Sequence, residues 1–222
     1  MSNFKNIFSF LENRKTFIIL CSLYAVIGIS VFFICLGTFS GDQYTYMYYA
    51  KGMHNGRYSY WYMLKDYVPD TFRNPGYAFI IYLLSFISED IRLIDFMHLL
   101  AFCGAIYLVF RIIDIYSKSP NYFVKNLFLL LMILNSHLLL YIDMVFPEVL
   151  MFFLIVLLVY LDLVLSKQKV STYLILGLLY GVIFQIRPVI LFFPFIKFFV
   201  DIFFQRKNFP LAKNALIIIV FI

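Results

Sequence analysis

The fold is decided near the N-terminus by the uncharged stretch TFIILCSLYAVIGISVFFICLGTF, which covers residues 16–39. A membrane-spanning α-helix needs about 20 predominantly apolar residues, so this run is long enough to cross a bilayer. The apolar region of a cleaved signal peptide is shorter, about 7–15 residues, and is followed by a cleavage site of small residues. No convincing site of that kind follows residue 39. We therefore expect a helix that is retained in the membrane.

The composition of the whole chain points the same way. Hydrophobic residues make up 64% of the chain and charged residues 14%, whereas soluble domains are about half apolar and about one quarter charged. The net charge of +6 comes from Lys and Arg at the ends of apolar runs, as the positive-inside rule describes, so we expect no nucleic-acid partner. Cys21, Cys35 and Cys103 all lie in apolar segments, which argues against a disulfide framework or a zinc site.

The basic residues also predict the topology. Lys5, Arg14 and Lys15 precede the first span, which places the N-terminus in the cytoplasm and residues 40–74 in an extracytoplasmic loop. Residues 76–87 would form a helix about 18 Å long, shorter than the roughly 30 Å hydrocarbon core. We interpret this segment as an interfacial or re-entrant helix. The alternative, that it crosses the membrane, would break the charge rule.

The remaining apolar runs predict five further spans of alternating direction. They cover Ile91–Ile113, Asn126–Tyr141, Pro147–Leu165, Thr172–Ile186 and Val189–Phe204. Residues 213–222 begin another run that is too short to cross, so we expect this chain to be the N-terminal part of a longer protein. The predicted fold is an all-α, polytopic transmembrane helical bundle. It forms a single domain over residues 1–222 in the cytoplasmic membrane, and its first outer loop carries interfacial helices.

This topology brings ionisable residues from separate segments to the extracytoplasmic side. They are Asp42, Arg73, Asp143, Glu148 and Arg187. Ionisable groups near a bilayer are costly and mark functional sites by default. Each also has a structural alternative: Asp42 can cap a helix, Glu148 can complement a helix dipole, and the arginines can lie at the headgroup level.

Aromatic residues in the first outer loop form a second group of candidates. Tyr46, Tyr49 and Ala50 follow helical spacing, which predicts a helix lying on the membrane surface. Tyr46, Tyr49 and Trp61 are candidates for stacking on a sugar ring, with an ordinary interfacial aromatic belt as the alternative. No phosphate-binding loop, dinucleotide fingerprint or zinc-protease motif occurs, so we expect no soluble nucleotide cofactor.

The order of these elements resembles the N-terminal half of the GT-C superfamily of integral membrane glycosyltransferases. The branch concerned includes protein O-mannosyltransferases and the aminoarabinose transferases of lipid A. The resemblance rests on an Asp early in the outer loop, a Pro-Gly-Tyr helix start, an acid opening a later span and a helix ending in Arg-Pro. Here these are Asp42 with Ala50, Gly56 and Tyr58, then Pro75-Gly76-Tyr77, then Glu148, then Gly177, Gly181, Arg187 and Pro188.

The resemblance implies a function and a role for each candidate residue. A hexosyl or pentosyl group would move, with inversion, from a polyprenyl-phosphate carrier to a hydroxyl of a glycan, lipid or protein acceptor outside the membrane. Asp42 would be the general base, and Arg187 with Arg73 would bind the lipid phosphate. Glu148 with Asp143 would orient the acceptor or hold a divalent metal, and metal use stays open.

Two other functional classes remain alternatives. A transporter or flippase of lipid-linked glycans would keep polar groups near the membrane midplane, where Asn135, His137 and Gln185 are the deepest in this chain. A non-catalytic membrane subunit would not need its outer carboxylates. Gln43 follows Asp42 where the GT-C family often has a second acid, which weakens a metal-binding reading of that position.

The topology is tested by cysteine labelling of intact cells. A membrane-impermeant thiol reagent should reach cysteines placed at Tyr60, Val145 and Arg187, because these positions are expected outside. The reagent should not reach cysteines at Lys118, Gln168 or Lys207. Labelling at residue 118 would contradict the expected topology and make residues 76–87 a true span.

Overall fold

A computed structural model describes residues 9–34, 41–64, 73–117, 120–165, 169–193 and 195–196. All regular secondary structure in these residues is helical, which confirms the all-α class. The chain divides into two compact units. One comprises residues 1–40 and 90–153, the other residues 41–89 and 154–222. Helix α8, Glu148–Val164, begins in the first unit and continues into the second.

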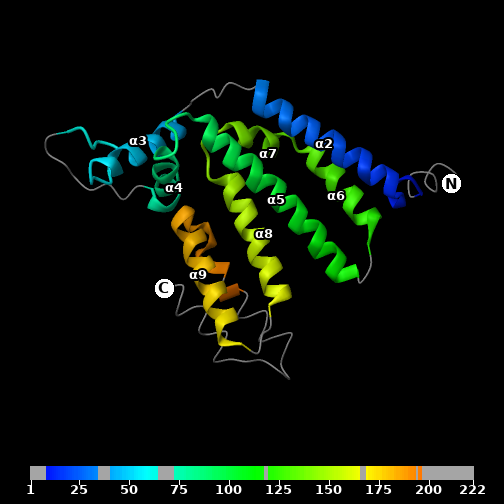
Figure 1. The fold of residues 1–222 in the computed structure, drawn as a ribbon. Coiled ribbons are helices and arrows are strands. Elements are labelled where there is room, and N and C mark those ends of the chain that lie inside the picture. Colours follow the sequence, from blue (N-terminus) through cyan, green and yellow to red (C-terminus); the bar gives the residue numbers. More distant parts are fainter. Residues whose placement is uncertain are drawn as a thin grey trace. The chain divides into compact units, whose positions relative to one another are not determined.

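The first unit is built from long apolar helices. Its elements are α2 (Arg14–Ile34), α5 (Arg92–Ser117), α6 (Tyr122–Leu134), α7 (Ser136–Leu140) and the 3₁₀ helix η1 (Tyr141–Asp143). Helix α2 packs along α5 and α6 (Figure 1), and the ring of Tyr24 stacks on Phe102 with centroids 5.6 Å apart. The Lys125 amine, largely buried, lies 2.7 Å from the Asp114 carboxylate, which joins α6 to α5.

The second unit holds the shorter helices. Its elements are α3 (Asp42–His54), α4 (Pro75–Ser85), α9 (Val170–Ile186) and the 3₁₀ helix η2 (Pro188–Phe192). Helix α4 packs against both α3 and α9 (Figure 1). The rings of Tyr49, Tyr77 and Tyr180 are buried in this unit. Helix α4 therefore connects α3 with α9 within this unit.

Local sequence explains where two of these helices begin or break. Pro75 occupies the first turn of α4, where its missing amide proton costs nothing, and the short helix expected at residues 76–87 is confirmed. The region expected to span from Asn126 to Tyr141 is not one continuous helix, and its crossing of a membrane stays a prediction. Asn135 has ψ of 76°, outside the helical range, and separates α6 from α7. Asn favours such local breaks because its side chain competes with the helix for backbone hydrogen bonds.

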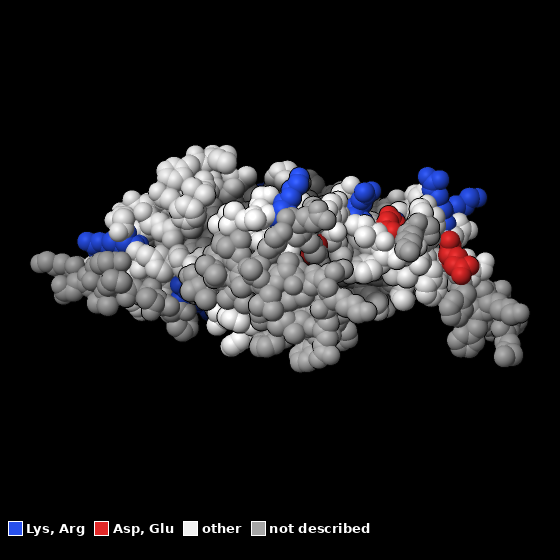
Figure 2. All heavy atoms as spheres, turned by 90° about the horizontal axis from the view of Figure 1, so that it is seen from below, with Lys and Arg blue, Asp and Glu red and all other residues white. Residues whose placement is uncertain are grey.

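Among the described residues, two helices, α2 and α5, are long and apolar enough to cross a membrane by length and composition. Helices α4, α6 and α9 are apolar but shorter. Only 17% of an apolar 18-residue segment of α2 is buried. Within α2, five apolar side chains are each at least half exposed: Ile18, Ile19, Val26, Ile29 and Phe33. On the face drawn in Figure 2, uncharged residues predominate among the described atoms. Exposed apolar surface of this extent favours contact with lipid. The six-span bundle and the single domain stay predictions.

The close approach of α4 to α9 requires a glycine at residue 76. A Cβ atom there would lie 2.6 Å from the carbonyl oxygen of Gln185 and 2.8 Å from the amide nitrogen of Ile186. Because both neighbours are backbone atoms of a helix end, neither can rotate away. At Gly181, further back in α9, a Cβ atom would meet no other atom within 4 Å.

These two glycines form a matched pair for a stability test. Gly76→Ala should lower the free energy of unfolding by about 1–3 kcal/mol, since it overpacks a helix contact. Gly181→Ala should raise it by up to about 1 kcal/mol, because Ala is the better helix former. Thermal unfolding of both variants in detergent measures the difference. A Gly76→Ala protein as stable as the Gly181→Ala protein would contradict the close packing of α4 on α9.

Candidate functional site

A pocket of about 210 Å³ in the second unit collects residues from separate segments of the chain. The contributing segments are α3, the two residues before α4, the last residues of α9 and the start of η2. The lining residues are Tyr46, Arg73, Asn74, Ile186, Arg187, Pro188 and Val189. Two arginines far apart in sequence therefore line one cavity, and we call it the arginine pocket.

The backbone of α9 holds one wall of this pocket in place. The side-chain amide of Asn74 donates a hydrogen bond to the carbonyl oxygen of Phe184 at 2.8 Å. Together with the contact of Gly76 on Gln185, this bond fixes the first turn of α4 on the last turn of α9. Asn74 was not among the candidates from sequence. Its position in the sequence could have identified it, because its side chain can form hydrogen bonds and lies directly before the proline that begins a helix.

Arg73 is held on three sides. Its Nη2 lies 2.6 Å from Oδ1 of Asp42, its guanidinium carbon lies 5.6 Å from the centroid of the Tyr46 ring, and the Tyr58 hydroxyl donates to its carbonyl oxygen. Burial alone would lower the pKa of Arg73, but the hydrogen bond to Asp42 and the nearby acidic groups raise it overall. The guanidinium therefore stays charged at the edge of the pocket.

Asp42 does not act as the helix cap. The capping position of α3 is Gly41, whose φ of 34° suits glycine, and Asp42 is the first helical residue. The capping interpretation is therefore wrong, because the carboxylate contacts Arg73 from within the first turn. The Asp42 side chain is 58% exposed, and exposed ion pairs contribute only about 0.2–1 kcal/mol. The carboxylate thus remains accessible, and the fold depends little on its charge.

Arg187 lies where α9 ends. Its backbone is extended, with φ of −154° and ψ of 121°, and its amide still donates to the carbonyl of Ile183 at 2.9 Å. The following Pro188 disfavours a helical conformation at Arg187, which stops the helix there. A cation at a helix C-terminus is stabilised by the helix dipole. The side chain is half-buried and lines the pocket that Arg73 also lines.

The structure separates the three aromatic candidates. Tyr49 is fully buried, with its ring 4.6 Å from the Tyr58 ring in a stacked arrangement, so the prediction that it stacks on a sugar is wrong. Tyr46 is 6% exposed and supports the Arg73 guanidinium, which makes it a positioning residue for the pocket. Trp61 is 62% exposed, and its role toward a sugar stays a prediction.

The two remaining carboxylates belong to the first unit. Asp143 ends η1 and Glu148 begins α8, so Glu148 occupies the helix terminus that favours an acid. Within the described ranges, no group of three or more His, Cys, Asp or Glu side chains is placed to hold a metal ion. That Glu148 holds a divalent metal with Asp143, or orients the acceptor, stays a prediction.

Comparison of the chain with protein-family models, with curated proteins and with solved structures found no match.

Proposed function

We propose that this protein is a membrane glycosyltransferase that moves a hexosyl or pentosyl group from a polyprenyl-phosphate carrier to an acceptor hydroxyl on the extracytoplasmic face. The observation that carries the proposal is the arginine pocket, with Arg73 and Arg187 on its walls and Asp42 in contact with Arg73. Guanidinium groups bind phosphate through paired, charge-assisted hydrogen bonds. A carboxylate next to such a site can accept the proton of an attacking hydroxyl.

The pocket suits the phosphate end of a lipid carrier. Two arginines can neutralise the charge that develops on a leaving phosphate. Asn74 places the N-terminus of α4 at the same pocket, and helix N-termini favour anions. Val189 and Ile186 add apolar surface beside these polar groups, where the first isoprene unit would lie.

The proposed reaction is an inverting displacement at the anomeric carbon of the donor sugar. The acceptor oxygen forms a bond to that carbon while the bond from the carbon to the phosphate oxygen breaks. The bonding pair leaves with the phosphate, whose negative charge Arg73 and Arg187 stabilise. The hydroxyl proton of the acceptor goes to the Asp42 carboxylate.

The contact between Asp42 and Arg73 links donor binding to base availability. In the structure these two side chains are 2.6 Å apart. A lipid phosphate in the pocket competes with Asp42 for the same guanidinium, so binding of the donor frees the carboxylate for the acceptor.

The acceptor side of the proposal rests on other residues. Glu148 and Asp143 are proposed to orient the acceptor, a glycan, lipid or protein, or to hold a divalent metal. Trp61 is proposed to stack on a sugar ring. The proposal includes a multi-pass topology with a cytoplasmic N-terminus, which places all these groups on one side of the membrane.

Asp42→Asn in the full-length protein should reduce sugar transfer about 10²–10⁴-fold, the usual contribution of a positioned acid–base group. Asn keeps the shape of the side chain but removes both its basicity and its ion pair with Arg73. Because exposed ion pairs contribute only about 0.2–1 kcal/mol, loss of the ion pair alone would be too small to explain a decrease of this size. The assay follows transfer from a radiolabelled polyprenyl-phosphate sugar in membranes with matched protein levels. Asp90→Asn is the matched control and should keep full activity, because an amide oxygen can still accept the bond from the Arg92 amide.

Glu148→Gln in the same assay separates two roles of that residue. Orientation of the acceptor predicts a smaller loss than for Asp42→Asn, and an essential metal predicts a comparable loss. Full activity of a well-inserted Asp42→Asn protein would contradict the assignment of Asp42 as the base.

A further inference from the structure

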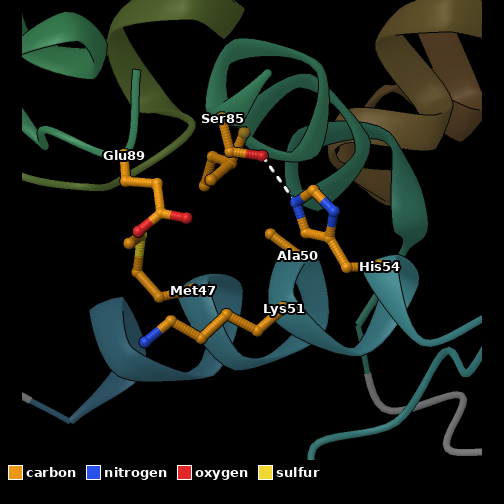
Figure 3. A pocket seen from close by; sticks show the side chains of 7 residues that line it. Met47, Ala50, Lys51, His54, Ser85 and Glu89 are labelled. Carbon is orange, nitrogen blue, oxygen red and sulfur yellow. Dashed lines mark hydrogen bonds between the residues drawn. The ribbon is translucent and has the colours of Figure 1, made fainter. Parts of the chain in front are cut away.

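A second pocket in the same unit, about 180 Å³ in volume, lies between α3 and α4 and shares no lining residue with the arginine pocket. Its lining residues are Met47, Ala50, Lys51, His54, Ile81, Ser85 and Glu89 (Figure 3). The four from α3 are spaced as i, i+3, i+4 and i+7, so they share one face of that helix. Met47, Ala50 and Ile81 supply apolar surface, and the other four are polar.

One end of this pocket is a fixed polar wall. The Ser85 hydroxyl donates to the carbonyl of Tyr82 at 2.6 Å, and Nε2 of His54 lies 2.7 Å from the same hydroxyl oxygen. A hydroxyl has one proton, so His54 is the donor in the second bond. The His54 ring also packs edge-on against Tyr82, with centroids 4.7 Å apart. Ser85 is therefore held as an acceptor and is not activated as a nucleophile.

The other side of the pocket carries one charge of each sign. Figure 3 shows the Lys51 amine and the Glu89 carboxylate away from the His54–Ser85 pair. Both side chains are exposed. In the part of the chain that the structure describes, ion pairs join Asp42 to Arg73 and Asp114 to Lys125, and none joins Lys51 to Glu89. Lys51 and Glu89 are therefore not paired with each other, and both remain available to a ligand.

We infer that this pocket binds a phosphoethanolamine group, with the phosphate on Lys51 and the ammonium on Glu89. A zwitterion satisfies both side chains, whereas a purely anionic headgroup would be repelled by Glu89 and a purely cationic one by Lys51. The ammonium of ethanolamine donates N–H bonds to a carboxylate, and the quaternary ammonium of choline has none to donate.

The apolar lining of the pocket fits the carbon atoms of such a ligand. Met47, Ala50 and Ile81 form a surface next to the charges, where the methylenes of ethanolamine or the glycerol of a lipid would lie. Two sources share this chemistry, the headgroup of phosphatidylethanolamine and free phosphoethanolamine. The inference is independent of the proposed glycosyl transfer, because no residue proposed to take part in that reaction lines this pocket.

The test is a lipid competition on the full chain in detergent. The protein is incubated with equal amounts of phosphatidylethanolamine and phosphatidylcholine, and native mass spectrometry counts each bound lipid. The wild type should retain phosphatidylethanolamine about three- to fivefold over phosphatidylcholine, as partly exposed ion pairs are weak. Lys51→Met should weaken the binding of both lipids. Glu89→Gln should abolish the preference between them.

Matched controls remove the same charges elsewhere. Lys169→Met and Glu12→Gln, outside this pocket, should bind as the wild type does. Competition by free phosphoethanolamine would show that the headgroup is sufficient, and its absence would identify the lipid as the ligand; both support the inference. A wild-type protein without preference for phosphatidylethanolamine, or a Glu89→Gln variant that keeps the preference, would overturn it.

Discussion

The candidate site depends on one backbone contact, the packing of Gly76 against the carbonyl of Gln185. With no side chain at residue 76, the start of α4 reaches the end of α9, and the hydrogen bond from Asn74 to Phe184 holds it there. In the sequence, Arg73 lies just before Gly76, and Arg187 lies just after Gln185. Arg73 and Arg187 line the same pocket because the two helix ends meet. Any larger side chain at residue 76 would move one arginine away from the other.

The helices were predictable from sequence because long apolar runs have few alternatives in a membrane. The positions where helices are interrupted were less predictable. Asn135 alone did not predict a break within residues 126–141, because one polar residue in an apolar run is compatible with a continuous helix. The backbone at Asn135 depends on its neighbours in the fold. The short helix after Pro75 was predictable because proline at a helix start and the limited apolar length both point to it.

The site was predictable in part for the same reason. Asp42, Arg73 and Arg187 stood out as charges at the ends of apolar runs. Arg73 and Arg187 line the pocket, and Asp42 contacts Arg73. The ion pair between Asp42 and Arg73 could not be read from sequence, because it depends on how α3 packs against α4. Tyr49 was a candidate that the structure does not support: its spacing placed it on one face of a helix, and its ring packs against Tyr58 inside the fold.

If the arginine pocket binds a lipid phosphate, the affinity of the protein for a short polyprenyl phosphate depends on both arginines, and equilibrium binding measures this dependence. Isothermal titration in detergent would compare the wild type with Arg187→Gln and Arg73→Gln, and use the uncharged prenyl alcohol as the reference ligand. Each variant should bind the phosphate at least about tenfold more weakly than the wild type, because it loses charge-assisted hydrogen bonds. The affinity for the alcohol should be the same in all three proteins. Equal affinity of all three proteins for the phosphate would show that the pocket does not bind it through these arginines.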